Sequence, residues 1–225
     1  MPLLPLPFFP PALFAQAPAP PNLQEAVERF DAAQAAVQTL EAPFTLTTRR
    51  ALLKTPTETR GTLYLQGSDF AHFVFSAPDD LILHLTPKEL ISYSPSAKQG
   101  ERLKVGHVIH ANRKFLGLGQ KLSFLSQYFE IGLGSSSDLQ GTWFLALTPR
   151  TLGMKRRMQA LDIWVDQRTW LPKRVLWVER GGDTWQLDLG PLKTNQSLPA
   201  AVTGFQVPAD IPLAKSFSFF APGRK

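Results

Sequence analysis

Hydrophobic positions near the start of the chain recur with a helical period. Between Leu23 and Leu40, apolar residues return every three or four positions, which is typical of a helix with one apolar face. Asn22 stands as an N-cap with Glu25 three residues later, and Pro43 follows the last periodic residue. We therefore predict one amphipathic helix from about Leu23 to Leu40.

Beyond residue 44 the period changes to two. Apolar and polar residues alternate in short runs that are separated by Gly, Pro and Asp, which predicts strands joined as antiparallel meanders. Two glycines inside the segment Arg180–Asp183 predict a tight hairpin turn. The predicted strands cover residues 62–66, 71–75, 81–85, 143–147, 159–165, 173–179 and 184–189.

The middle of the chain departs from this alternation. Residues 115–129 are rich in Phe and Leu and are interrupted by Gly117 and Gly119, which predicts one or two short helices. Residues 132–137 are Gly- and Ser-rich and predict a flexible turn. The fold class expected is therefore α+β: a single curved antiparallel sheet, or half-barrel, with helices covering its concave face.

Composition narrows the classes of protein. The chain has 225 residues, a hydrophobic fraction of 44% and a formal net charge of +6, which suits a globular domain with one sizeable core. It contains no Cys, which excludes a disulfide scaffold, a Cys-ligated metal site and a thiol nucleophile. No run of about 18 apolar residues is free of Pro, so no conventional membrane-spanning helix is predicted.

The first 21 residues have the character of a leader. They carry no charged side chain, are rich in Leu and Phe, and reach Ala15-Gln16-Ala17, an A-x-A pattern that resembles a secretory cleavage site. No Lys or Arg precedes the apolar stretch, and Pro18 would follow the cut. We interpret residues 1–21 as a signal peptide or, alternatively, as a Pro-rich leader.

Candidate chemistry is sparse, so we predict no catalytic residue, no metal, no cofactor and no nucleic-acid partner. His107 and His110 are the closest His pair, but zinc would need at least one more ligand. His72 and His84 are interpreted as surface or rim residues in strands. Three further groups are interpreted as solvated: Asp162, Asp166 and the basic run Lys155-Arg156-Arg157.

One apolar face of the predicted sheet is the candidate binding site. A single sheet under a few short helices leaves a wide concave face, and an apolar cavity is the usual form of a small-molecule or lipid site. Periodicity does not separate such a cavity from an ordinary filled core, and both interpretations stay open at this stage. The residues that would line it are Leu63, Leu65, Phe73, Phe75, Leu83, Leu161 and Ile163.

Several short motifs follow the first helix in a recognisable order. They are Gly61-Thr62-Leu63-Tyr64-Leu65, Phe73-Val74-Phe75-Ser76-Ala77-Pro78, Lys88-Glu89-Leu90-Ile91-Ser92-Tyr93-Ser94-Pro95, Leu147-Thr148-Pro149 and Phe205-Gln206-Val207-Pro208. In this order the chain, from about Leu23 to Pro208, resembles the periplasmic outer-membrane lipoprotein carrier family, LolA.

The resemblance implies a fold and a function. It implies a half-barrel with a cavity for acyl chains, closed by a lid that includes Phe115, Leu116, Phe124 and Leu125. It implies a monomeric periplasmic carrier, not an enzyme, that takes acylated lipoproteins from an inner-membrane lipoprotein-releasing ABC transporter to an outer-membrane acceptor. Residues 22–211 would form the carrier domain and residues 212–225 a C-terminal extension.

The chain also departs from the family pattern. Family members often place an Arg after the first strand to hold the lid, whereas Gln66-Gly67-Ser68 stands here. We therefore expect apolar contacts from residues 115–129 and from the first helix to hold it. Two alternative functions remain. One is a lipid- or lipoprotein-sensing module on the same fold, similar to RseB, and the other is a hydrolase or isomerase with an apolar pocket.

Overall fold

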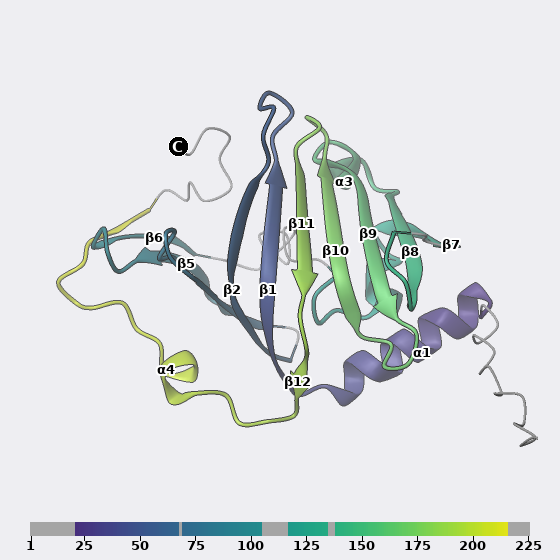
Figure 1. Cartoon of the computed structure of the whole chain (residues 1–225), viewed down its shortest axis with the longest axis horizontal. Helices are drawn as coiled ribbons and strands as arrows, with labels where there is room; N and C mark the ends of the chain where they lie inside the picture. The colour runs from purple at the N-terminus through teal and green to yellow at the C-terminus, as the bar shows by residue number, and fades with distance from the viewer. Residues whose placement is uncertain (1–20, 68, 105–116, 135–137, 216–225) are drawn as a thin grey trace, which may run out of the picture.

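The fold is dominated by one large sheet. The computed structural model describes residues 21–67, 69–104, 117–134 and 138–215 (Figure 1). Its 13 strands run in the order β13-β6-β5-β4-β3-β2-β1-β11-β10-β9-β8-β7, with β12 paired to β1 off this path. All neighbours pair antiparallel except β13, which is parallel to β6. The first and last strands of this order do not pair with each other, so the sheet is not closed into a barrel.

Short elements accompany the sheet. Among the described residues, α1 is the only helix longer than four residues. The elements are α1 (Leu23–Ala36), β1 (Thr39–Arg49), β2 (Thr57–Gln66), β3 (Phe70–Phe75), β4 (Ile82–Leu85), β5 (Glu89–Ser94), β6 (Gln99–Lys104), α2 (Leu122–Leu125), β7 (Phe129–Gly134), β8 (Thr142–Pro149), α3 (Leu152–Lys155), β9 (Met158–Asp166), β10 (Pro172–Glu179), β11 (Thr184–Leu189), β12 (Lys193–Thr194), α4 (Ala200–Thr203) and β13 (Leu213–Ala214).

Helix α1 begins as predicted but ends earlier. The Asn22 Oδ1 atom accepts a hydrogen bond from the Glu25 N–H at 2.9 Å, which confirms the predicted cap. The helix stops at Ala36, and Val37 is already extended. The predicted end at Leu40 is wrong because Leu40 pairs with Leu65 of β2 and with Thr194 of β12. Pairing on both sides outweighs an apolar spacing that also suited a helix.

All seven predicted strand segments lie in or overlap strands of the sheet, and the turn at Arg180–Asp183 joins β10 to β11. The middle segment differs from the prediction. Phe129 begins strand β7 instead of ending a helix, and Gly132 and Gly134 lie in that strand instead of a flexible turn. They pair with Ala146 and Phe144 of β8, where a small residue leaves room for the facing aromatic ring.

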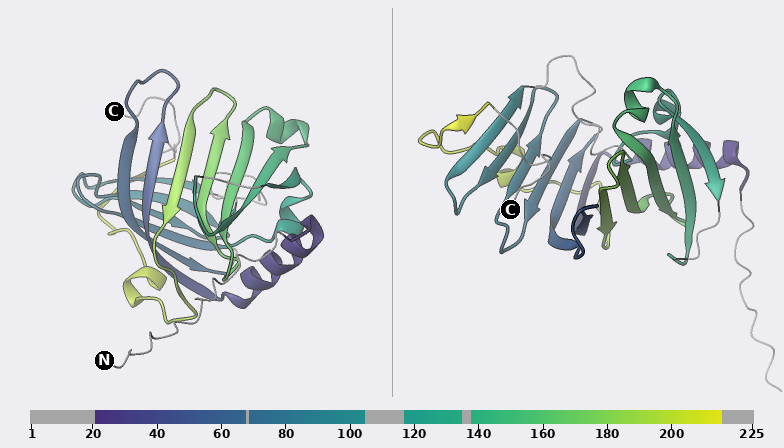
Figure 2. Two further views of the ribbon diagram at one scale, coloured as in Figure 1. Left: turned by 45° about the vertical axis from the view of Figure 1, so that its right-hand side comes forward. Right: turned by 90° about the horizontal axis from the view of Figure 1, so that it is seen from above.

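Helix α1 lies at the end of the sheet where β1 begins, opposite the β1–β2 hairpin (Figure 1). The sheet is strongly bent, so that β5 and β6 run at a steep angle to β1 and β11 (Figures 1 and 2). The chain between β12 and β13 passes back along the β5–β6 side, where Leu213 and Ala214 add a strand to β6. The segment after Ile211, predicted as an extension, therefore starts as part of the sheet.

Candidate functional site

One face of the sheet is apolar across almost its whole width, and this face holds the core. Residues that face one another across neighbouring strands have the same orientation, so the buried rows can be followed from strand to strand. Leu63 faces Phe73, which faces Leu83, and on the other half Leu161 faces Leu147. We call this the inner face. The buried cluster on it extends from β5 to β7 and includes Phe30 of α1.

The seven predicted cavity residues all belong to this buried cluster. They are Leu63, Leu65, Phe73, Phe75, Leu83, Leu161 and Ile163. Two of them border hollow space: Leu65 lines one pocket and Phe75 lines another. The other five line neither of these two pockets. Phe73 is an example, since its ring packs edge-on against Phe44 with the centroids 5.6 Å apart.

The first pocket, which we call the α1 pocket, has a volume of about 700 Å³. It lies between the end of α1, the paired ends of β1 and β2, the chain from residue 118 to residue 124, and the ends of β10 and β11. Its lining is Gln34, Ala35, Val37, Gln38, Thr39, Leu40, Leu65, Gln66, Gly67, Asp69, Leu118, Gly119, Gln120, Lys121, Phe124, Leu171, Pro172 and Leu189. Its described lining therefore combines apolar side chains such as Leu40 and Leu65 with polar ones such as Gln34 and Gln66.

The segment from Gly117 to Leu125 forms one wall of the α1 pocket. Gly117 has φ of +90°, and a Cβ atom there would lie 3.1 Å from Ile163 and 3.2 Å from Val175, so glycine lets the chain approach the inner face. Leu125 is fully buried, whereas Phe124 is half-buried and lines the pocket. Of the four predicted lid residues, these two are described, and Phe115 and Leu116 lie outside the described residues.

Helix α1 holds this segment by a polar contact and an apolar one. The Asp31 carboxylate accepts hydrogen bonds from the N–H groups of Leu122, at 2.6 Å, and Ser123, at 3.2 Å. It thereby caps the N-terminus of α2, because the N-cap residue of that helix, Lys121, makes no capping hydrogen bond with its own side chain. Phe30 of α1 is completely buried in the shared core. The sequence did not reveal the Asp31 contact, because its partners lie some 91 residues away.

Gly67 stands where the resemblance described above leads us to expect Arg. It adopts φ of +59°, and its N–H donates to the Gln38 carbonyl at 2.9 Å. Gln66 is exposed and lines the α1 pocket beside it. Among the described residues that line this pocket there is no arginine. The wall at this point is thus closed by backbone hydrogen bonds and by apolar packing of the Gly117–Leu125 segment.

A second pocket of about 810 Å³ lies farther along the inner face. We call it the hairpin pocket, because the β1–β2 hairpin forms one of its walls. The Arg50 guanidinium lies 5.0 Å from the ring centre of Trp185 and 2.8 Å from the Asp183 carboxylate. The lining is Leu46, Thr48, Arg50, Leu53, Thr57, Thr59, Phe75, Asp79, Leu81, Ser92, Ser94, Ala97, Gln99, Gly100, Glu101, Trp185, Pro212, Leu213 and Ala214.

The opposite, outer face of the sheet carries a buried histidine pair. His72 and His84 face each other on β3 and β4 with their Nδ1 atoms 2.9 Å apart, so one ring donates and the other accepts. They are only 2% and 7% exposed, which corrects the prediction of surface or rim residues. Phe205 covers both rings, with centroids 5.1 and 4.9 Å away, and no local pattern could have shown this.

Burial sets the protonation of this pair. Burial and the charge of the facing His84 ring lower the pKa of His72 to about 4. Burial also lowers the pKa of His84, although the nearby Glu89 carboxylate acts in the opposite direction. Both rings are therefore neutral at neutral pH. Their contacts are with each other and with aromatic rings, which indicates a structural role.

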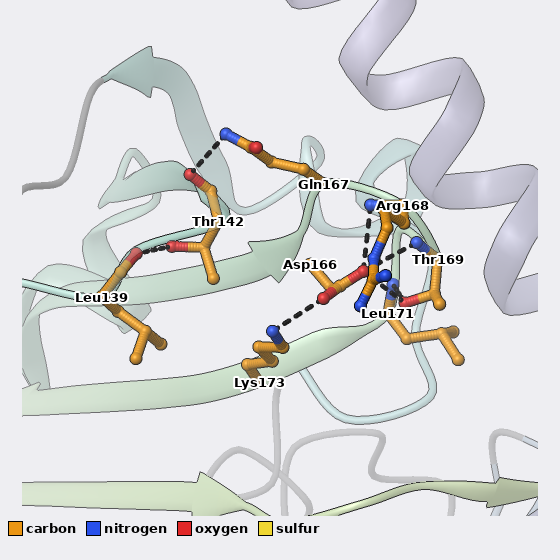
Figure 3. Close-up of polar contacts among 8 residues, drawn as sticks. All are labelled: Leu139, Thr142, Asp166, Gln167, Arg168, Thr169, Leu171 and Lys173. Carbon is orange, nitrogen blue, oxygen red and sulfur yellow. Dashed lines mark hydrogen bonds and ion pairs between the residues drawn. The ribbon is translucent and has the colours of Figure 1, made fainter. Parts of the chain in front are cut away.

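The two aspartates of β9 are also less solvated than predicted. Asp166 is 6% exposed and accepts hydrogen bonds from the N–H groups of Arg168 and Thr169, while Lys173 lies 2.7 Å away (Figure 3). Burial alone would raise the pKa of Asp166, but these hydrogen bonds and the Lys173 charge lower it to about 2. Burial raises the pKa of the half-buried Asp162 to about 6. Asp166 thus fixes the β9–β10 turn.

The remaining candidate features are a metal site, a membrane-spanning helix, the basic run and the pair His107 and His110. Among the described residues, no group of three His, Asp or Glu side chains is placed to hold a metal ion. No helix of these residues has the length and apolar character to cross a membrane. Lys155, Arg156 and Arg157 are exposed at the end of α3, as predicted. His107 and His110 lie outside the described residues.

Comparisons with known proteins find a matching protein family and solved structures with a similar fold. The family model described as outer membrane lipoprotein carrier protein LolA matches residues 35–206. No curated protein sequence matches the chain. An uncharacterized conserved protein from Thermus thermophilus has a similar structure, with a TM-score of 0.53 and 15% identity over 86% of this chain and 98% of that one.

Two more solved structures are similar. MucB has a TM-score of 0.50 and 13% identity, over 85% of this chain and 64% of MucB. A LolA superfamily protein from Nitrosomonas europaea has a TM-score of 0.41 and 14% identity, over 80% of this chain and 96% of that protein. At such identities the likeness concerns the fold alone.

Proposed function

Because the chain belongs to the outer membrane lipoprotein carrier protein LolA family, we propose that it binds the acyl chains of lipoproteins in the α1 pocket and carries them between membranes. The observation that carries this proposal is the pocket itself. Its volume of about 700 Å³ lies within the usual range of ligand sites. Leu40, Leu65, Leu118 and Phe124 give it an apolar wall, and polar side chains make up much of the remaining lining.

The physical need for such a pocket follows from the cargo. Each methylene group removed from water contributes about 0.8 kcal/mol, so an acyl chain of a dozen or more carbons needs a shielded site while it crosses an aqueous compartment. No catalytic group takes part in this process. Loading and release depend on the difference in affinity between the carrier and the membrane proteins on either side.

The architecture we propose is a half-barrel whose inner face is covered by α1 and by the Gly117–Leu125 segment. The Asp31 carboxylate and the buried Phe30 and Leu125 side chains join the two helices, so we expect them to move together as a lid. A lid held by apolar packing and one cap can open without breaking a salt bridge. The family Arg that is replaced by Gly67 is then not required.

The partners and the location that we propose are those that membership of the family suggests. We propose a periplasmic monomer that receives acylated lipoproteins from an inner-membrane lipoprotein-releasing ABC transporter and delivers them to an outer-membrane acceptor. Residues 1–21 would serve as the signal peptide. A chain expressed with its own leader should then appear in the periplasm about 2 kDa lighter, and a full-length chain confined to the cytoplasm would contradict this location.

A matched pair of substitutions on α1 tests the binding site. Ala35 is exposed and lines the α1 pocket, whereas Ala32 is exposed on the same helix and does not line it. We expect Ala35→Trp to fill part of the pocket and to weaken binding of a fluorescent fatty-acid probe by at least about tenfold, roughly 1.4 kcal/mol. We expect Ala32→Trp to leave the affinity within about twofold. Equal affinities for the two variants would contradict the assignment of the pocket.

A lipid- or lipoprotein-sensing module on the same fold is the second candidate, because the apolar wall of the α1 pocket would suit a retained acyl chain as well as a transported one. A carrier passes its cargo on, whereas a sensor retains it. Native mass spectrometry of the protein purified from the periplasm would show co-purified acylated cargo in either case. Incubation with vesicles that contain the outer-membrane acceptor would then deplete this cargo only if the protein is a carrier.

A further inference from the structure

Three turns lie side by side at one end of the sheet, the end opposite α1 (Figure 1). They are the β1–β2 hairpin, the connection through α3 before β9, and the β10–β11 turn. The Ala51 N–H donates to the Asp183 carboxylate at 2.9 Å, which joins the first turn to the third. The Arg180 N–H donates to the Arg157 carbonyl at 3.0 Å, which joins the third to the second. We call residues 49–57, 150–157 and 179–184 the basic rim.

The basic rim concentrates positive charge. Its three stretches contain eight Lys or Arg residues and only two acidic residues, a net +6 that equals the formal net charge of the whole chain. One of the two acidic residues, Asp183, is already paired with Arg50. The basic residues are Arg49, Arg50, Lys54, Arg150, Lys155, Arg156, Arg157 and Arg180.

Leucine side chains project from the same rim. Leu52 is 97% exposed, Leu53 62% and Leu152 65%, and they stand at the tip of the β1–β2 hairpin and at the start of α3. Among the described residues only two other large apolar side chains, Leu23 and Leu103, are exposed, at 41% and 36%. The most exposed leucines thus lie among the densest basic charge.

The rim also borders the hairpin pocket. Arg50 and Leu53 belong to the basic rim and line that pocket at the same time. The two acidic residues of the described lining, Asp79 and Glu101, come from the β3–β4 turn and from β6, whereas Arg50 comes from the basic rim. An apolar chain could therefore pass from a surface touched by the rim to the inner face without crossing the sheet.

We propose that the basic rim docks on the anionic surface of a lipid bilayer, with the leucine tips inserted below the headgroups and the Lys and Arg side chains at the phosphates. Apolar tips flanked by Lys and Arg match the interfacial layer of a bilayer, where an apolar side chain and a cation are both satisfied at slightly different depths. The orientation brings the hairpin pocket to the lipid surface. That consequence for lipid exchange rests on the proposed carrier function, whereas the docking itself does not.

A bilayer fits these residues better than a protein partner does. A protein interface usually has a continuous apolar centre that is surrounded by a polar rim. Here the leucines stand on two separate turns, each flanked by basic side chains, and Leu52 is almost completely exposed. Such separate tips insert individually into a soft interface.

Vesicle flotation with purified protein tests the docking. We expect binding to vesicles of phosphatidylglycerol and phosphatidylcholine, little binding to phosphatidylcholine alone, and release at high salt. Arg156→Glu with Arg157→Glu should weaken binding by more than about tenfold, since each basic residue near an anionic surface contributes about fivefold. Lys88→Glu with Lys104→Glu, which are exposed at the opposite end of the strands, should have less than about a twofold effect.

The role of the rim leucines is tested separately, with the exposed Leu103 outside the basic rim as the control. Leu52→Ser with Leu152→Ser should weaken vesicle binding by at least about threefold, and Leu103→Ser should not change it. Equal binding to neutral and anionic vesicles, or rim variants that bind like the unmodified protein, would overturn the proposal. So would rim variants that lose an acidic protein partner but keep the vesicles. A protein that floats with vesicles but binds no acyl probe in solution would refute the proposed function and leave the docking intact.

Discussion

Acidification should destabilise the fold at the histidine pair of β3 and β4. The folded protein keeps His72 and His84 neutral, with the pKa of His72 lowered from 6.5 to about 4 by burial and by the facing ring. The unfolded chain therefore binds more protons between these pH values. The stabilisation is complete above about pH 6.5 and is lost as the pH falls towards 4.

The size of the effect follows from these pKa values. Between about pH 7.5 and pH 5, the proton affinity of His72 alone changes the free energy of unfolding by roughly 2 kcal/mol, because each pKa unit corresponds to about 1.4 kcal/mol. The groups around the histidine pair change this free-energy difference only in part. Glu89 opposes the lowered pKa of His84, but Glu89 is itself paired with Arg102 at 3.2 Å, and Tyr64 presents a ring 6.2 Å from His72.

Asp162 changes the free energy of unfolding in the opposite direction over the same pH range. Its pKa is raised to about 6 in the fold, so the folded state takes up the proton first and gains roughly 1 kcal/mol on acidification. Asp166, with a pKa of about 2, loses its stabilising effect only below about pH 4. The measurement therefore belongs in an Asp162→Asn background, in which the carboxylate contribution is removed.

The assay is urea unfolding of that background with and without His72→Gln, at about pH 7.5 and about pH 5. Glutamine can still hydrogen-bond to His84, so the variant is expected to remain folded. We expect the protein with His72 to lose roughly 2 kcal/mol more on acidification than the Gln variant. Losses that agree within about 0.5 kcal/mol would refute the claim that the fold keeps this ring neutral.

Three other predictions concern the lid and its contacts. Phe30→Ala removes a completely buried ring and should lower the free energy of unfolding in urea by about 3–5 kcal/mol, whereas a loss below about 1 kcal/mol would show that α1 is not part of the core. Asp31→Ala removes the cap of α2 and should cost about 1 kcal/mol and speed hydrogen exchange in residues 117–125, where unchanged exchange would contradict it. Phe124→Ala should weaken acyl-probe binding by about tenfold and Gln66→Ala by less than about threefold, and the reverse order would indicate a polar latch.

Most of the sheet could be predicted from the sequence because one face is buried. A strand such as β3 must then place Phe73 and Phe75 on the inner face and His72 on the other, so the alternation shows both the strand and its orientation. The end of α1 could not be predicted in this way. Leu40 fits the apolar spacing of the helix as well as the inner face of β1, and only its pairing decides between them.

The site was predictable only in part, for a similar reason. Leu65 and Phe124 line the α1 pocket, and both have a clear place in the apolar pattern. The hairpin pocket is assembled from β1, β2, β5, β6, β11 and the chain near Leu213, which are far apart in sequence. The same holds for the burial of His72 and His84 under Phe205. Contacts of this kind depend on the tertiary arrangement and leave no local signal.

The central claim is that acyl chains bind between α1, the Gly117–Leu125 segment and the inner face of the sheet. Photocrosslinking with a fatty acid that carries a diazirine near its methyl end, followed by peptide mass spectrometry, tests it without altering the protein. We predict crosslinks at Leu40, Leu65, Leu118 and Phe124, and competition by unlabelled fatty acid. Crosslinks confined to the outer face around His72, or labelling that excess fatty acid does not reduce, would contradict the account.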